Sequence, residues 1–180
     1  PILTYRFLML SVLSLFFIMA SYKTSAADAL LSKEQFLEKA FGDKEAKKKS
    51  LRFKDEVKNT AQKIMGSKYK KVLMRYWIDG QRTAWILNRI GKVKQITAGF
   101  IIENCKIVSI HVLVYRESHG WEVKYPSFRD QFKGISMSNK YKLDKGIDGI
   151  SGATLSVNSM RIMASLALAM HYLVPDIKCP

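Results

Sequence analysis

The chain has 180 residues, 48% of them hydrophobic, so it is long enough and apolar enough to form one domain with a buried core. It contains 30 Lys and Arg against 15 Asp and Glu, which gives a formal net charge of +15. Two cysteines without metal-ligand spacing and three dispersed histidines exclude a recognisable metal cluster.

The first 26 residues have the layout of a secretory signal peptide. An almost unbroken apolar run at residues 7–20 follows Arg6, and small residues occupy positions 24–27. The run is shorter than the roughly 20 residues of a membrane-spanning helix. We therefore predict that residues 1–26 are a signal peptide and that the mature protein is periplasmic or otherwise extracytoplasmic. The alternative is an uncleaved anchor in the inner membrane. Export argues against nucleic-acid binding, despite the basic charge.

Residues 27–70 form a Lys-rich segment for which we predict two helices, at residues 33–41 and 55–65. The order Ser32 to Gln35 has the form of a capping box, and Gly42 and Gly66 are placed to end the helices. Between the helices, residues 43–50 hold four lysines. We interpret them as a solvated loop or helix end.

The pattern then changes to strands, predicted at residues 71–78, 83–90, 95–102 and 107–115. Asp79-Gly80 is a strong hairpin signal between the first two. In the last strand, alternation assigns one face to Val108, Ile110, Val112 and Val114, and the other to Ser109, His111, Leu113 and Tyr115. We predict an α+β fold in which an antiparallel β-meander with one buried side packs against helices.

A closing helix is predicted at residues 155–173. It is apolar on nearly all sides, so we interpret it as a buried core helix, with docking to a membrane protein as the alternative.

Residues 148–156 read Asp-Gly-Ile-Ser-Gly-Ala-Thr-Leu-Ser and run directly into that helix. The small side chains of Ser151, Gly152 and Ala153 allow a tight turn and a close approach to the backbone. The hydroxyl of Thr154 is placed just before the helix begins, where unpaired amides and the helix dipole favour an anion such as a phosphate. A simple helix N-cap is the plain alternative.

The pattern Asp-x-x-Ser-Gly-Ala-Thr-x-Ser resembles the flavinylation motif of the FMN-binding domain family. This family includes a component of the sodium-translocating NADH:quinone oxidoreductases, a component of the related Rnf complex and many small periplasmic proteins. The resemblance implies that residues 71–180 are an FMN-binding domain and that a flavin transferase attaches FMN to Thr154 through a phosphoester, using FAD. It also places five neighbouring residues at the cofactor: Asp148, Ser151, Gly152, Ala153 and Ser156.

The segment after the last predicted strand resembles a second element of the same family, which lies near the flavin. Glu117, Ser118 and Gly120 align with this element, whereas His119 stands where many relatives have proline. The resemblance makes Glu117 and Ser118 candidates for contacts to the flavin ring. Residues 128–134 resemble the family's short aromatic helix and glycine, which we interpret as packing. Most aromatic residues are interpreted as core, and a flavin-stacking role is left open for Trp77, Trp85 and Trp121.

The expected function is that of an exported electron carrier rather than a self-sufficient enzyme. No Gly-rich dinucleotide fingerprint, Cys-x-x-Cys-His haem motif or hydrolase-like order of Ser, His and Asp is present. The expected partners are the transferase and a redox partner such as a cytochrome or membrane oxidoreductase. A stand-alone flavin-dependent reductase and a flavin-free basic membrane-surface or interaction module are the alternatives.

Two questions stay open in the sequence. Cys105 and Cys179 can pair in an oxidising compartment, although we favour the interpretation of Cys105 as a small buried residue. The excess positive charge is interpreted as a solvated surface because the lysines are spread along the chain. Docking to an acidic partner or to an anionic membrane is the alternative.

Overall fold

The computed structural model describes residues 29–66, 69–138 and 141–179. The predicted signal peptide or anchor at residues 1–26 lies outside the described residues. In the described part of the chain, no helix is both long enough and apolar enough to cross a membrane.

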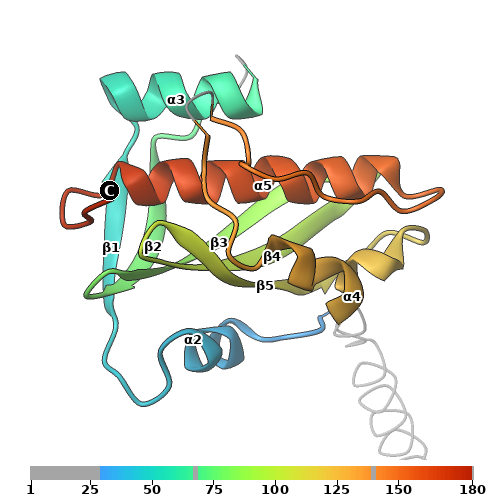
Figure 1. Cartoon of the computed structure of the whole chain (residues 1–180), viewed down its shortest axis with the longest axis horizontal. Coiled ribbons are helices and arrows are strands. Elements are labelled where there is room, and N and C mark those ends of the chain that lie inside the picture. Colours follow the sequence, from blue (N-terminus) through green and yellow to red (C-terminus); the bar gives the residue numbers. More distant parts are fainter. Residues whose placement is uncertain (1–28, 67–68, 139–140, 180) are drawn as a thin grey trace, which may run out of the picture.

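Five strands form one antiparallel sheet whose spatial order follows the chain (Figure 1). Their bounds are β1 Lys47–Arg52, β2 Leu73–Asp79, β3 Arg82–Ile90, β4 Gln95–Glu103 and β5 Lys106–Tyr115. The last four match the predicted meander to within two residues at each end. Gly80, with φ of 54°, makes the expected tight turn between β2 and β3. The α+β class with an antiparallel meander is therefore confirmed.

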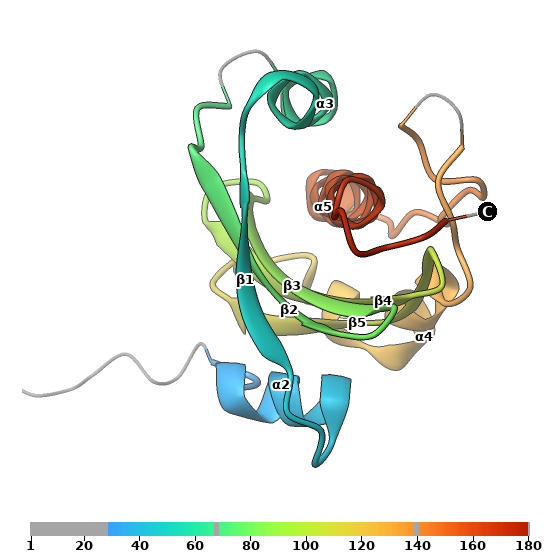
Figure 2. The ribbon, with the colours of Figure 1, turned by 90° about the vertical axis from the view of Figure 1, so that its left-hand side faces the viewer.

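Helices cover both faces of this sheet within the described residues. Their bounds are α2 Lys33–Phe41, α3 Asp55–Met65, α4 Pro126–Arg129 and α5 Thr154–Tyr172. Figure 2 shows the sheet curving around α5, with α3 beyond α5 and α2 on the opposite face. Both predicted N-terminal helices are confirmed. Ser32 and Gln35 make the two hydrogen bonds of the capping box.

The Lys-rich stretch before α3 is a strand, not the predicted loop or helix end. β1 pairs antiparallel with β2, from Lys47 opposite Ile78 to Arg52 opposite Leu73. Only Leu51 of β1 is buried. Lysine is a common residue on edge strands because its charge discourages pairing with another chain. A strand composed largely of lysines has no alternating hydrophobic pattern, so hydrophobic periodicity does not predict it.

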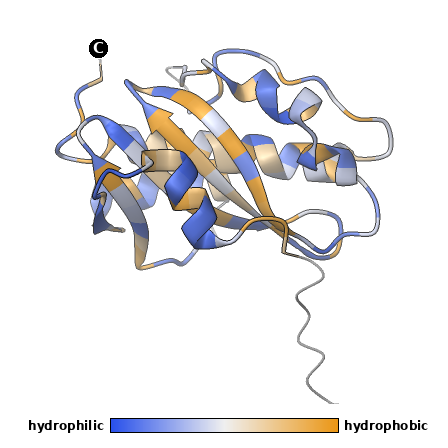
Figure 3. Ribbon diagram, turned by 90° about the horizontal axis from the view of Figure 1, so that it is seen from below, coloured by the Kyte–Doolittle hydropathy of each residue, from blue (hydrophilic) through white to orange (hydrophobic). Residues whose placement is uncertain are grey.

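The predicted faces of β5 are partly wrong because the strand contains two irregularities. The pairing with β4 shifts register between Ile101 and Ile102 and again between Thr97 and Ala98. Each shift exchanges the faces of the following residues. Ile110 and Val112 join the core under α5, whereas Val108 and Val114 pack against the second core under α2. Both sides of the sheet are thus buried, and Figure 3 shows hydrophobic residues along its strands.

The closing helix α5 lies in the main core, as predicted, and starts one residue earlier than expected. Buried residues along it include Val157, Met160, Met163 and Leu168. Phe128 and Phe132 are buried in the same core, which confirms their packing role.

A polar trio inside this core links α5 to β3. Thr83 Oγ1 lies 2.7 Å from His171 Nδ1 and accepts a 2.8 Å hydrogen bond from Trp85 Nε1. Burial lowers the pKa of His171 to about 4, so this side chain is neutral at pH 7. His171 therefore has a structural role. As a neutral side chain it does not supply a positive charge to the C-terminal end of the helix.

The interpretation of Cys105 as an unpaired residue is wrong. Cys105 and Cys179 form a disulfide that ties the β4–β5 turn to the C-terminal segment, with 5.6 Å between their Cα atoms. His171 lies close to both sulfurs, so the fold gathers three residues that are dispersed in the sequence. The sulfurs are bonded to each other, and sequence spacing alone does not reveal this proximity.

We expect Cys179→Ser to lower the free energy of unfolding by about 2–4 kcal/mol, because the disulfide closes a loop across a sequence separation of 74 residues. Cys179 is the less buried partner, so the substitution leaves the packing of Cys105 intact. Chemical denaturation with and without reductant measures the effect. Reductant should destabilise the wild-type protein and leave the variant unchanged. Equal stability of the wild-type protein and the variant in the absence of reductant would contradict the assignment of the disulfide.

Candidate functional site

Three segments that are distant in the sequence meet around the start of α5. They are the β3–β4 turn at residues 91–94, the loop after β5 at residues 116–120, and the first turn of α5. Figure 1 shows the start of α5 and the loop after β5 at the same end of the molecule. Together they line a pocket of about 460 Å³. Six of the predicted site residues line it: Glu117, Ser118, Gly152, Ala153, Thr154 and Ser156.

Thr154 is the first residue of α5, and its side chain is exposed in the pocket. The N-cap position belongs to Ala153, which has no side-chain capping bond. Within the described residues, the Thr154 hydroxyl makes no hydrogen bond, so the plain alternative of a Thr154 N-cap is not observed. The first intrahelical bond runs from Val157 N to Ala153 O at 3.0 Å. The backbone amides of residues 154–156 therefore have no hydrogen-bond partner within the helix, and they belong to the same turn as the hydroxyl.

Two predicted residues lie outside the lining of this pocket. Asp148 is exposed, and its backbone amide donates to Gln131 Oε1 at 2.7 Å. Ser151 is also exposed, at the turn that precedes Gly152. The φ of Gly152 is 76°, a conformation that glycine adopts without strain. Asp148 and Ser151 thus belong to the loop that leads to the pocket, and their roles stay predictions.

Glu117 joins two of the three segments. Its Oε1 accepts hydrogen bonds from the backbone amides of Lys92, Val93 and Lys94, at 2.6, 2.7 and 2.9 Å. Burial raises the pKa of this carboxyl, but the three amide bonds outweigh burial and lower the pKa below its usual value. The carboxylate therefore fixes the β3–β4 turn at the pocket rim. The sequence indicated a contact between Glu117 and a flavin ring but not this structural contact.

Gly120 and Tyr115 hold the loop against α5. A Cβ atom on Gly120 would lie 3.0 Å from Ala153 Cβ and 3.1 Å from Ser156 Oγ. Tyr115 donates to the carbonyl of His119 at 2.6 Å, and its hydroxyl lies 3.4 Å from Ser156 Oγ. The carbonyl of His119 makes this contact, so the contact does not depend on the side chain at that position. Burial raises the pKa of Tyr115, which keeps its proton available for donation.

Gly91 is a site residue that sequence reasoning missed. A Cβ atom there would lie 2.8 Å from Glu117 Oε1 and 3.3 Å from Ser156 Oγ. The position has no room for a side chain, because the carboxylate and α5 both approach its backbone. The sequence signal was a glycine between two predicted strands, which is also the signal of an ordinary turn.

The three tryptophans lie away from the lining of this pocket. Trp85 is fully buried and stacks on Tyr76, with 4.8 Å between ring centroids. Trp77 packs in the second core, and Trp121 lies 5.2 Å from Tyr125, centroid to centroid, on the surface. A core role is therefore observed for Trp85 and Trp77.

A comparison with protein-family models matches residues 91–169 to the FMN-binding domain. This chain carries an FMN-binding domain. The matched segment begins at Gly91 and includes Glu117 and Thr154, so it contains all three segments of the pocket. The match supports flavin binding by this segment of the chain. A search of curated proteins found no match to the chain.

We expect Gly120→Ala to lower the free energy of unfolding by about 1–3 kcal/mol more than Gly134→Ala, because overpacking is added to backbone strain. Gly134 is a matched control, since its φ of 78° is close to the 74° of Gly120 and a Cβ atom added to it would meet no other atom within 4 Å. Chemical denaturation of both full-length variants measures the difference. Equal destabilisation would show that close packing of the loop on α5 is unimportant.

Proposed function

We propose that this FMN-binding protein is an exported electron carrier whose FMN is attached through a phosphoester to Thr154. The observation that carries the proposal is the position of the Thr154 hydroxyl. It is exposed, free of hydrogen bonds within the described chain, and located at the N-terminus of a 19-residue core helix. A phosphate at this oxygen would face unpaired helix amides, which favour negative charge.

The residues around Thr154 fit such a group. Gly152 and Ala153 leave the hydroxyl accessible, and the pocket of about 460 Å³ adjoins it. In the proposed attachment, the Thr154 oxygen would form a bond to the flavin phosphate of FAD, with AMP as the leaving group and loss of the hydroxyl proton. Bound FMN supplies one- and two-electron transfer, and the protein supplies anchoring and orientation.

Several contacts give this site a fixed geometry. α5 is buried along most of its length, so Thr154 is held by the core. Glu117 immobilises the β3–β4 turn, and Tyr115 and Gly120 hold the following loop on α5. Lys92 lines the pocket and would favour the negatively charged reduced form of a flavin, which raises its potential.

The setting of the carrier is part of the same proposal. We place the protein outside the cytoplasm, with residues 1–26 as signal peptide or anchor, where a dissociated cofactor is lost by diffusion and a covalent bond prevents that loss. A flavin transferase matures it. A cytochrome or a membrane oxidoreductase exchanges electrons with it, at or near an anionic membrane surface.

We expect Thr154→Val to abolish covalent flavin when the full chain is co-expressed with a flavin transferase, because valine keeps the shape of threonine and lacks only the hydroxyl. Flavin fluorescence of the protein band after a denaturing gel measures attachment. Thr154→Ser, which keeps a hydroxyl, should retain some fluorescence, and Ser151→Ala should retain more than Thr154→Val.

Fluorescence that persists in Thr154→Val would refute the assignment of the anchor. A wild-type band without flavin, in the presence of an active transferase, would favour the flavin-free interaction module instead.

A further inference from the structure

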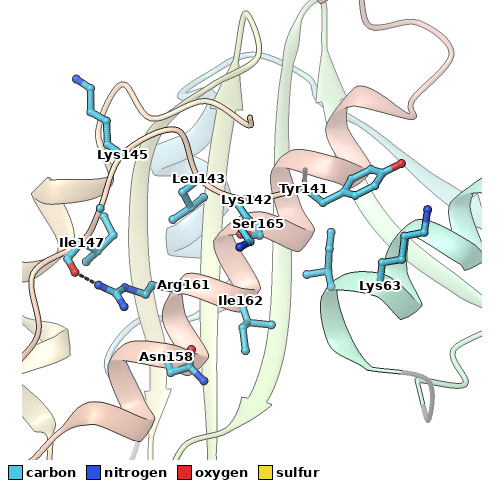
Figure 4. Close-up of a pocket in the computed structure, with 12 residues that line it drawn as sticks. Lys63, Tyr141, Lys142, Leu143, Lys145, Ile147, Asn158, Arg161, Ile162 and Ser165 are labelled. Carbon is cyan, nitrogen blue, oxygen red and sulfur yellow. Dashed lines mark hydrogen bonds between the residues drawn. The ribbon is translucent and has the colours of Figure 1, made fainter. Parts of the chain in front are cut away.

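A second and larger pocket, of about 610 Å³, lies along α5 beyond the first turn (Figure 4). Three segments form it: α3, the loop at residues 141–147, and the face of α5 that carries Asn158, Arg161, Ile162 and Ser165. It shares no lining residue with the pocket at Thr154. We call it the cationic pocket.

Four positive side chains from these three segments line the cationic pocket: Lys63, Lys142, Lys145 and Arg161. None of its lining residues is acidic. Asp144 is the acidic residue of the same loop. It lies outside the lining and accepts hydrogen bonds from Ser136 N and Ser136 Oγ, at 3.2 and 2.7 Å. The fold therefore concentrates positive charge that is dispersed in the sequence, and it leaves that charge uncompensated within the lining.

The remaining lining is apolar or donates hydrogen bonds. Ile64, Leu143, Ile147 and Ile162 supply the apolar surface. The side chains of Asn158 and Ser165 add an amide and a hydroxyl. Such a lining, apolar with several donors and no carboxylate, suits a ligand with an apolar body and a negative group.

Two contacts hold cations of the pocket in place. Arg161 donates to the backbone carbonyl of Ile147, which fixes the guanidinium at one side (Figure 4). Lys63 Nζ lies over the ring of Tyr141, 5.4 Å from its centroid, at the other side. The charges are thus partly pre-organised, which lowers the entropy cost of binding an anion.

We propose that the cationic pocket is a binding site for a small organic anion, a carboxylate or phosphate on an apolar body. The site does not depend on a flavin at Thr154. Asn158, Arg161 and Ser165 follow Thr154 at steps of four, seven and eleven residues, so they lie on the same face of α5. Asn158 is about 6 Å along the helix axis from Thr154. The α5 residues that line the pocket therefore lie about one to three helical turns from the proposed flavin anchor.

The test uses the full chain purified without a transferase and the fluorescent sulfonate 1-anilinonaphthalene-8-sulfonate as probe. We expect Lys142→Ala/Lys145→Ala to weaken probe binding about tenfold, because two of four attracting charges are lost. Lys54→Ala/Lys58→Ala is the matched control. It removes the same charge from exposed positions outside the pocket and should change binding less than twofold.

Competition and chemical shifts identify the ligand class and the location. Displacement of the probe mainly by phenyl phosphate indicates a phosphate ligand, and displacement mainly by benzoate indicates a carboxylate. Neutral benzyl alcohol, which lacks the negative group, should not displace the probe. In ¹⁵N spectra, the displacing anion should shift amides of residues 141–147 and not those of residues 91–94. Equal weakening in the two lysine pairs, displacement by benzyl alcohol, or shifts confined to residues 91–94 would overturn the proposal.

Because flavin attachment is measured separately on Thr154 variants, loss of this proposal leaves the electron-carrier proposal intact, and the reverse also holds.

Discussion

The burial of α5 determines the geometry of everything around it. This helix lies between the sheet and α3, and the side chains that fill the core fix its axis and its rotation. Its first residue, Thr154, therefore has little freedom to move, although its own side chain is exposed. A flexible surface loop would offer the same hydroxyl at many orientations. A core helix holds the backbone that carries the hydroxyl in one position, with unpaired amides in the same helical turn.

The sheet supplies the other side of the site by bringing two turns to the start of α5. Glu117 spans these turns with three amide bonds, and Gly91 and Gly120 allow the backbones to approach the helix closely. None of these contacts requires a bound ligand. These contacts lie within the protein itself, which fits the proposal that a transferase attaches the flavin to a site already folded.

Local signals in the sequence predicted most of the fold, and non-local contacts account for the errors. The capping box at Ser32 and the turn at Gly80 depend on neighbouring residues, so they were readable. β1 was missed because its lysines form a strand only through pairing with β2. The Cys105–Cys179 bond and the register shifts in β5 likewise depend on residues far along the chain. The family motif identified the Thr154 segment, whereas the gathering of charge around Arg161 became visible only in three dimensions.

The most direct test of the central claim is peptide mass spectrometry of the chain matured by a flavin transferase. Trypsin releases residues 146–161, a peptide that contains four hydroxyl side chains: Ser151, Thr154, Ser156 and Ser159. We predict that this peptide gains the mass of one FMN less one water, and that fragmentation assigns the gain to Thr154. A gain on one of the serines or on another peptide, or an unmodified peptide in a protein exposed to active transferase, would contradict the account.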